Sequence, residues 1–170
     1  MNIQDKNDQF ISVIEGHKGI LYKITNAYCK DIEDRKDLMQ EIYFQLWKSF
    51  DNYVNDYKYS TWIYRISLNV AISFYRKENS RSKIAIPFKE EIINFSDTND
   101  SHEKESNFNK LQQFIAALKK LDKALMLLYL EEKSYKEIAE IIGITETNVA
   151  TKINRIKIKL RQEFTQIKNQ

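Results

Sequence analysis

Apolar residues recur at three- and four-residue steps near the start of the chain and predict an amphipathic first helix. They are Phe10, Val13, Ile14, His17, Ile20, Leu21, Ile24 and Tyr28. A second helix is expected to begin in the acidic stretch 31–34, since negative charge stabilises a helix N-terminus. Its apolar row is formed by Leu38, Ile42 and Leu46. The chain is therefore expected to open with two amphipathic helices.

A third helix is predicted after residues 51–60, a polar segment with three tyrosines that is expected to form a loop. Ser60 is the expected N-cap, because its hydroxyl can accept a hydrogen bond from a free backbone N–H. The apolar face of this helix is formed by Trp62, Ile66 and Val70. Another face carries Arg65 and Asn69, one turn apart. Trp62 is interpreted as a core anchor rather than as part of a binding site.

Residues 84–107 lack apolar periodicity and divide the chain into two parts. They contain the only proline, Pro87, and the polar run 96–106, and they are predicted to be a flexible linker. Helical periodicity resumes at Phe108 and continues through Leu111 and Ile115. The predicted fold is all-α, with two small helical domains at 1–83 and 108–170.

The segment from Ser134 to residue 161 has the pattern of a helix-turn-helix. Ser134 and Glu137 fit a capping box, which starts a short helix. Gly143 can take the left-handed conformation that ends it, and Thr145 can cap the helix that follows. Ala139, then Gly143, then Val149 is the spacing of tightly crossed DNA-binding helices, which let the second helix enter the major groove.

The outward residues of that second helix are the candidate DNA contacts. They are Asn148, Thr151, Lys152, Asn154 and Arg155. Asn and Arg side chains can pair bidentately with base edges, whereas Lys and Thr can hold phosphates. The competing interpretation is a helical hairpin with a solvated basic face.

The distribution of charge favours DNA over a merely solvated face. The net charge of the 170 residues is only +3, but residues 145–161 carry five basic side chains against one acidic. Residues 75–83 carry four basic against one acidic, whereas residues 88–107 carry six acidic against two basic. Two basic regions separated by an acidic connector indicate two sites for a polyanion.

The composition points to an intracellular protein without enzymatic chemistry. Cys29 is the only cysteine, and neither a bilayer-spanning apolar run nor a signal-peptide pattern occurs, so a cytoplasmic location is expected. There is no phosphate-binding glycine loop, no nucleophile elbow and no zinc-ligand set with two His and one Cys. No catalytic residue, metal, cofactor or small-molecule substrate is therefore expected.

Both parts of the chain resemble the sigma-70 family of RNA polymerase sigma factors. SYKEIAEIIGITETNVATKINRIKIKLR, residues 134–161, resembles sigma region 4, which reads the promoter −35 element. DLMQEIYFQLWKSF, residues 37–50, resembles region 2.2, and STWIYRISLNVAISFYRK, residues 60–77, resembles regions 2.3 and 2.4. The resemblance leaves no segment for region 3 or region 1.1, which indicates the extracytoplasmic-function group, also called group 4.

The resemblance implies a role for several surfaces. A polar stripe on the second helix would dock on the β′ clamp helices of core polymerase; it consists of Asp37, Gln40, Glu41 and Gln45. The alternative for these residues is an ordinary solvated helix face. Exposed Phe44 and Trp47 beside the stripe favour an interface. Further implied partners are the β flap of polymerase, promoter DNA and an anti-sigma factor.

For the −10 element, the resemblance implies capture of bases from a melted strand. The loop 51–60 would form the pocket, with Arg65 and Asn69 beneath it. Phosphates of the upstream duplex would be held by Arg76, Lys77 and Arg81. Two departures from the family pattern leave the −35 sequence undetermined: Ala150 stands at a common contact position, and Asn148 replaces a common Thr. A third departure puts Asp122 after Leu121, where it can cap a helix.

Two other classes of function are open at this point. A stand-alone regulator with a C-terminal helix-turn-helix would need a dimer interface and a two-fold operator, and it would give residues 37–50 no role. An enzyme has little support, since the acidic residues form no pair distinct from a solvated face. The sigma factor is the interpretation that uses both halves of the chain.

Overall fold

The computed structural model describes residues 3–54, 56–81 and 102–168, and their regular elements are all helical. Side chains are described for residues 4–54, 56–74 and 107–165. The first lobe consists of α1 (Ile3–Tyr28), α2 (Ile32–Ser49), the short 3-10 helix η1 (Phe50–Asn52) and α3 (Tyr59–Arg81). The second lobe consists of α4 (His102–Ala117), α5 (Lys120–Leu130), α6 (Tyr135–Ile142) and α7 (Glu146–Lys168). The all-α fold class is confirmed.

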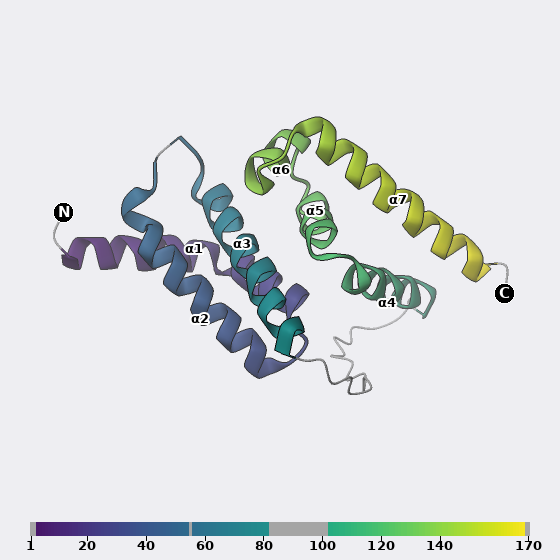
Figure 1. Cartoon of the computed structure of the whole chain (residues 1–170), viewed down its shortest axis with the longest axis horizontal. Helices are drawn as coiled ribbons and strands as arrows, with labels where there is room; N and C mark the ends of the chain where they lie inside the picture. Colours follow the sequence, from purple (N-terminus) through teal and green to yellow (C-terminus); the bar gives the residue numbers. More distant parts are fainter. Residues whose placement is uncertain (1–2, 55, 82–101, 169–170) are drawn as a thin grey trace.

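The first lobe is a three-helix bundle in which α3 packs against both α1 and α2 (Figure 1). Its fully buried side chains come from all three helices: Leu21, Ile24, Leu38, Ile42, Leu46, Ile63 and Leu68. Burying one such side chain contributes about 1.5–3 kcal/mol. The apolar rows predicted for the first two helices are therefore the sides that face the core.

Local sequence sets the start of α2 but not that of α3. Asp31 caps α2, since its carboxylate accepts hydrogen bonds from the backbone N–H groups of Glu33 at 2.8 Å and Asp34 at 3.3 Å. The prediction that Ser60 caps the third helix is wrong, because α3 already begins at Tyr59. The ring of Tyr59 stacks on Tyr53 at 4.4 Å, and the helix begins two residues earlier than the cap pattern implies.

The second lobe packs α5, α6 and α7 around Leu125, Leu128, Ile138, Val149 and Ile153, all of which are fully buried. Helix α4 contacts α5. It begins at His102 and so takes up the end of the predicted linker 84–107, whose residues 84–101 lie outside the described part. The prediction that Asp122 caps a helix is also wrong, because the N-cap of α5 is Lys119 and Asp122 lies in the first turn.

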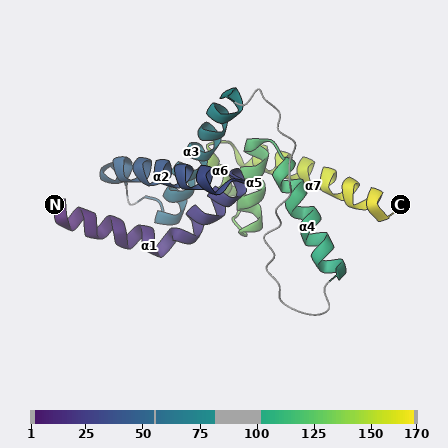
Figure 2. The same ribbon diagram turned by 90° about the horizontal axis from the view of Figure 1, so that it is seen from below.

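The two lobes lie in contact, which the sequence did not predict. Figures 1 and 2 show α5 and α6 beside α3, while α4 and the C-terminal part of α7 project away from the first lobe. The expectation of two helical domains is confirmed, whereas their relative arrangement could not be predicted from the sequence. A single buried apolar cluster includes residues of both lobes.

Substitution of Gly143 and of Gly19 by alanine should change the stability of the fold in opposite directions. Gly143 has φ of +79°, so Gly143→Ala should destabilise the fold by about 1 kcal/mol, the strain of a Cβ in this conformation. Gly19 is exposed inside α1 with open space around it, so Gly19→Ala should stabilise the fold by about 0.5–1 kcal/mol. Urea denaturation of both variants measures the difference, and equal effects would contradict the assigned conformation of Gly143.

Candidate nucleic-acid and polymerase interfaces

The turn between α6 and α7 has the geometry predicted for a helix-turn-helix. Ser134 accepts from the backbone N–H of Glu137 at 3.2 Å, and the Glu137 carboxylate accepts from the backbone N–H of Ser134 at 2.9 Å, which completes the capping box. Gly143 is left-handed, and its N–H donates to the carbonyl of Ala139 at 2.8 Å. Thr145 then caps α7 by accepting from Asn148 N–H at 3.2 Å.

The first half of α7 has a buried apolar side and an exposed polar side. Val149 and Ile153 are fully buried. The side chains of Asn148, Thr151, Asn154 and Arg155 are exposed, and Lys152 is half-buried. We call these five residues the recognition face. The structure therefore brings together all five predicted DNA contacts on one helix surface.

Two details of α7 refine the predicted contacts. The hydroxyl of Thr151 donates to the carbonyl of Thr147 at 2.9 Å, so it must rotate before it can donate to a phosphate. Lys157 contributes to the basic charge of this segment, but its ammonium donates to the hydroxyl of Tyr129 on α5 at 3.2 Å and lies 5.2 Å from that ring. Part of the positive charge therefore serves packing within the lobe.

The polar stripe predicted on the second helix lies on the solvent side of α2. Asp37, Gln40 and Glu41 are exposed, and the half-buried Gln45 donates its amide to the Glu41 carboxylate at 2.9 Å. The four residues lie along two turns of one helix face, as the spacing predicts. Phe44 is 57% exposed beside them, although its large apolar ring favours burial.

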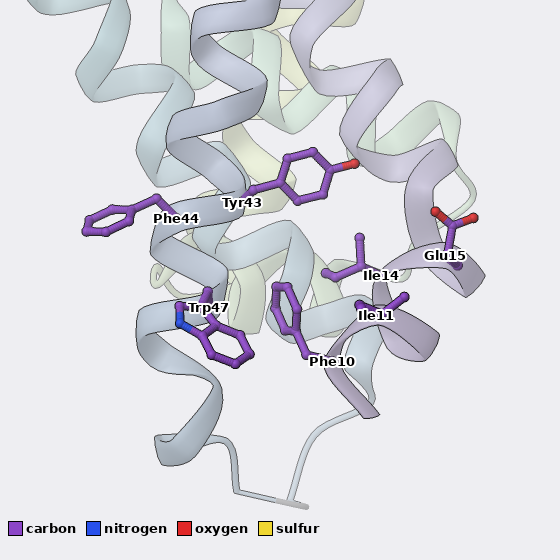
Figure 3. A pocket seen from close by; sticks show the side chains of 7 residues that line it. All are labelled: Phe10, Ile11, Ile14, Glu15, Tyr43, Phe44 and Trp47. Atoms are coloured by element: carbon purple, nitrogen blue, oxygen red, sulfur yellow. The ribbon is translucent and has the colours of Figure 1, made fainter. Parts of the chain in front are cut away.

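An apolar groove of about 500 Å³ lies between α1 and α2, next to the polar stripe. Its lining residues are Phe10, Ile11, Ile14, Glu15, Tyr43, Phe44 and Trp47. Figure 3 shows Phe10 and Trp47 turned toward each other and Phe44 turned outward. Lys6 lies over the Trp47 ring at 4.3 Å and pairs with Asp51 at 2.6 Å, which fixes the start of α1 beside η1.

The α3 side of the first lobe carries the candidate −10 contacts. Arg65 and Asn69 are both exposed, one turn apart on α3. The preceding loop is held by the stacked rings of Tyr53 and Tyr59, and Trp62 packs its edge against Tyr53 at 5.4 Å. Trp62 is thus half-buried in an aromatic cluster, as its interpretation as an anchor predicts. The side chains of Arg76, Lys77 and Arg81 lie outside the described residues, although the backbone of α3 extends to Arg81.

The comparisons with known families match this division of the chain. Residues 13–81 match Sigma-70 region 2, and residues 108–160 match Sigma-70, region 4. RNA polymerase sigma factor SigZ of Bacillus subtilis (strain 168) is 29% identical, over 95% of this chain and 86% of its own length. ECF RNA polymerase sigma factor SigW of the same organism is 26% identical, over 92% and 89%. This chain belongs to the extracytoplasmic-function group of the sigma-70 family. As a sigma factor it directs RNA polymerase to promoters.

Two solved structures have the same fold. Sigma factor RpoE in complex with the anti-sigma factor NepR, from Bartonella quintana, matches with a TM-score of 0.65 at 15% identity, over 96% of this chain and 98% of that one. CnrH in complex with the cytosolic domain of CnrY matches with a TM-score of 0.65 at 17% identity, over 94% and 89%. Sigma factors are DNA-binding regulators rather than enzymes. Membership of a family that acts with RNA polymerase favours the sigma factor over the stand-alone dimeric regulator and the enzyme.

The part that α1 of this sigma factor plays in the groove is not visible in the apolar row of the first helix. Ile11 falls outside the apolar row of the first helix, and the structure leaves it 58% exposed. The available signal was an isoleucine outside the apolar row of an amphipathic helix. In the described ranges, no group of three or more His, Cys, Asp or Glu side chains has the arrangement of a metal site. No helix in these ranges has the length and hydropathy of a membrane span.

Glu137 gives a pH prediction for the helix-turn-helix of this sigma factor. Hydrogen bonds from the backbone and the hydroxyl of Ser134 hold the pKa of Glu137 below its ordinary value of 4.5. A lowered pKa stabilises the fold above the ordinary value, and this stability is lost as pH falls through the folded-state pKa. Glu137→Gln keeps a capping side chain without the titration.

The wild-type chain should therefore lose more unfolding free energy than Glu137→Gln between about pH 6 and about pH 3. Urea denaturation followed by circular dichroism measures both chains across this range. Parallel pH profiles would show that the capping carboxylate has no linkage to folding.

Proposed function

We propose that this sigma factor acts through three surfaces on two domains, 1–83 and 108–170. The polar stripe of α2 docks on core polymerase, the recognition face of α7 reads the −35 element, and α3 with its preceding loop captures the −10 strand. The observation that supports this proposal most directly is the solvent exposure of the candidate contact residues. All described candidate contacts of the three surfaces are exposed or half-buried, while the opposite sides of the same helices are buried.

For the −35 element, the proposed contacts divide into base readers and phosphate holders. Asn148, Asn154 and Arg155 have exposed side chains that can pair with base edges in the major groove. Lys152 and Thr151 would hold the backbone. In this division the two asparagines and the arginine read the base sequence, whereas the lysine and the threonine position α7 on the DNA backbone.

For the −10 element, capture of an unstacked base requires aromatic surface and polar edges close together. The loop before α3 supplies Tyr57, which is 48% exposed, and Tyr53, whose ring stacks on Tyr59. Arg65 and Asn69 would contact the strand below the loop. We assign the upstream phosphates to Arg76, Lys77 and Arg81, which follow on the same helix.

For polymerase, the stripe of Asp37, Gln40, Glu41 and Gln45 would bind the β′ clamp helices, and the second domain would bind the β flap. The apolar groove beside the stripe, with exposed Ile11 and Phe44, adds apolar area at this place. An interface with an apolar centre and a polar rim is the usual composition of a specific protein contact.

The setting proposed for the protein follows from these partners. It works in the cytoplasm with promoter DNA, without a cofactor, a metal or a small-molecule substrate, and without inserting into a membrane. Its activity is held back by an anti-sigma factor, as the anti-sigma factor NepR bound to the similar RpoE suggests. Enzymatic activity is not part of this proposal.

The experiment that tests the proposal is transcription by purified core polymerase with the full chain added. Promoter-specific transcripts above those of core alone are expected. Glu41→Lys replaces the negative charge in the middle of the stripe by a positive one, which would repel a basic partner surface. The substitution should reduce the affinity for core polymerase by about tenfold or more, which corresponds to about 1.4 kcal/mol or more. Pull-down on core polymerase measures the binding step separately from transcription.

The matched control is Glu163→Lys, the same charge change on an exposed residue of α7 beyond the segment that matches region 4. It should bind core like the wild-type chain. Equal loss of binding in both variants would show a general charge effect and would contradict the assignment of the stripe. Transcription no higher than with core alone on all genomic promoters would contradict the function itself.

Arg155 and Lys152 separate base readout from phosphate contact. If Arg155 pairs with a guanine, Arg155→Ala should cost about 1–3 kcal/mol and relax specificity at one −35 position. Lys152→Ala should weaken binding to all promoters alike and lower the slope of log affinity against log salt by about one. Binding of the holoenzyme to a set of −35 variants measures both effects, and a uniform loss for both mutants would contradict direct readout by Arg155.

A further inference from the structure

The loop before α3 is contacted at both of its ends by the first turns of α1. The end at η1 contains Asp51, whose carboxylate lies 2.6 Å from the ammonium of Lys6. The end that enters α3 contains Tyr59, whose hydroxyl accepts a hydrogen bond from the side-chain amide of Gln9 at 3.4 Å. These contacts join residues 45 and 50 positions apart in the sequence. One helix therefore contacts the loop where it begins and where it ends.

Lys6 is the member of this contact whose position is least expected, because a lysine side chain ordinarily extends into solvent. Its side chain is only 20% exposed. The ammonium lies between the carboxylate of Asp51 and the ring of Trp47, whose centroid is 4.3 Å away, a cation–π distance. The positive charge of Lys6 is therefore matched within the protein, at the junction of α2 and η1.

The residues of α1 that contact the loop region share one face of the helix. Lys6, Gln9 and Phe10 stand at positions i, i+3 and i+4, which are neighbours on a helix surface. The ring of Phe10 meets that of Phe50, in η1, edge-on at 5.3 Å. All three residues precede residues 13–81, the segment that matches Sigma-70 region 2. The start of α1 thus adds contacts to the loop that the matched segment does not contain.

The contact at Tyr59 continues into the loop itself. The ring of Tyr59 stacks on Tyr53 at 4.4 Å, with 20° between the ring planes. The hydroxyl of Tyr53 donates in turn to the backbone carbonyl of Tyr57, the exposed aromatic residue assigned above to the −10 strand. A displacement of Tyr59 would therefore move the side chain that fixes the backbone of Tyr57.

We propose that Lys6 and Gln9 are positioning residues for the −10 pocket: they fix the two ends of the loop on one helix face and thereby set how strictly the loop selects a base. Neither side chain touches DNA in this role. A loop that is fixed before the base binds loses less conformational freedom on binding, and it holds its contact groups at one spacing. This inference rests on the proposed function, because it takes the loop as the −10 pocket.

Binding of the holoenzyme to forked DNA with a single-stranded −10 segment tests the proposal. Each base of this segment is replaced in turn, and discrimination is the ratio of the affinity for the preferred base to the mean affinity for the others. Lys6→Gln removes the charge that pairs with Asp51, so it should lower this ratio by about threefold or more at the positions bound by the loop. Lys6→Arg should restore the ratio, because a guanidinium can pair with the carboxylate and stack on the Trp47 ring.

The hydrogen bond between Gln9 and Tyr59 is tested by a double-mutant cycle. Gln9→Ala and Tyr59→Phe each remove one side of this bond, and Tyr59→Phe keeps the ring that stacks on Tyr53. Each should lower the −10 discrimination by about twofold, and the double variant should lose no more than either single variant, because the effects of residues in contact are not additive. A loss in the double variant equal to the product of the single losses would contradict the role of Gln9.

The matched control is Lys18→Gln, the same charge change on an exposed residue of α1 that pairs with Glu15 inside the helix at 3.0 Å. It should leave the −10 discrimination unchanged. Lys6→Gln should also keep wild-type affinity for core polymerase and wild-type discrimination among −35 variants, since the polar stripe and the recognition face do not include Lys6.

Four outcomes of these measurements are decisive. Wild-type −10 discrimination in Lys6→Gln would overturn the proposal. So would an equal loss on every −10 variant with a lower salt dependence, which is the result expected if Lys6 binds a phosphate. A parallel loss of −35 discrimination would show a general defect and would overturn it too. Absence of base discrimination by the wild-type holoenzyme would instead overturn the proposed function.

Discussion

Helix α3 is packed against neighbours on more than one side, and the arrangement of the whole molecule depends on that packing. It contacts α1 and α2 within the first lobe and α5 and α6 of the second. Ile63, Leu68 and Ala71 are buried along it. Ser67 is buried as well, and its hydroxyl has no hydrogen-bond partner among the described residues, a cost of about 1–3 kcal/mol that the surrounding apolar packing must offset.

The same helix also carries part of the proposed DNA contact. Arg65 and Asn69 occupy the only side of α3 left to solvent along these turns, whereas Tyr64 faces the second lobe. One helix therefore joins strand capture to the position of the other lobe. A change in the position of the second lobe would alter the surroundings of Tyr64 but would leave Arg65 exposed to solvent. The contact between the lobes and the proposed DNA contact therefore use different sides of α3.

A second local constraint governs α6 and α7. Their close crossing depends on Ala139, which presents almost no side chain, and on Gly143, which reverses the chain at positive φ. These two residues let Val149 and Ile153 reach the core, and only then do the polar residues on the other side of α7 stand clear of the protein. The recognition face is thus a consequence of what the opposite side of the helix buries.

Local sequence by itself determined most of the helices, the capping box of α6 and the faces of α2 and α7. The face of α3 was not determined in this way, because the predicted apolar residues Trp62, Ile66 and Val70 are only half-buried and the core side is formed by Ile63, Leu68 and Ala71. Periodicity and capping residues act within one or two turns, so the Asp31 cap, the Ser134–Glu137 box and the exposed side of the stripe could be predicted without coordinates. The position of the α3 start could not, because it depends on the stacking of Tyr59 on Tyr53 across a loop.

Only the tertiary structure decided how distant segments combine. The groove needs Ile11 and Phe44 from two helices, and neither residue shows in isolation that the other lies opposite. The burial of Lys123 against Ala27 joins residues 96 positions apart, and a lysine on a helix is ordinarily read as solvent-facing. Such contacts depend on the packing of whole helices, whose relative placement no local pattern encodes, and this is why the relative arrangement of the lobes could not be predicted from the sequence.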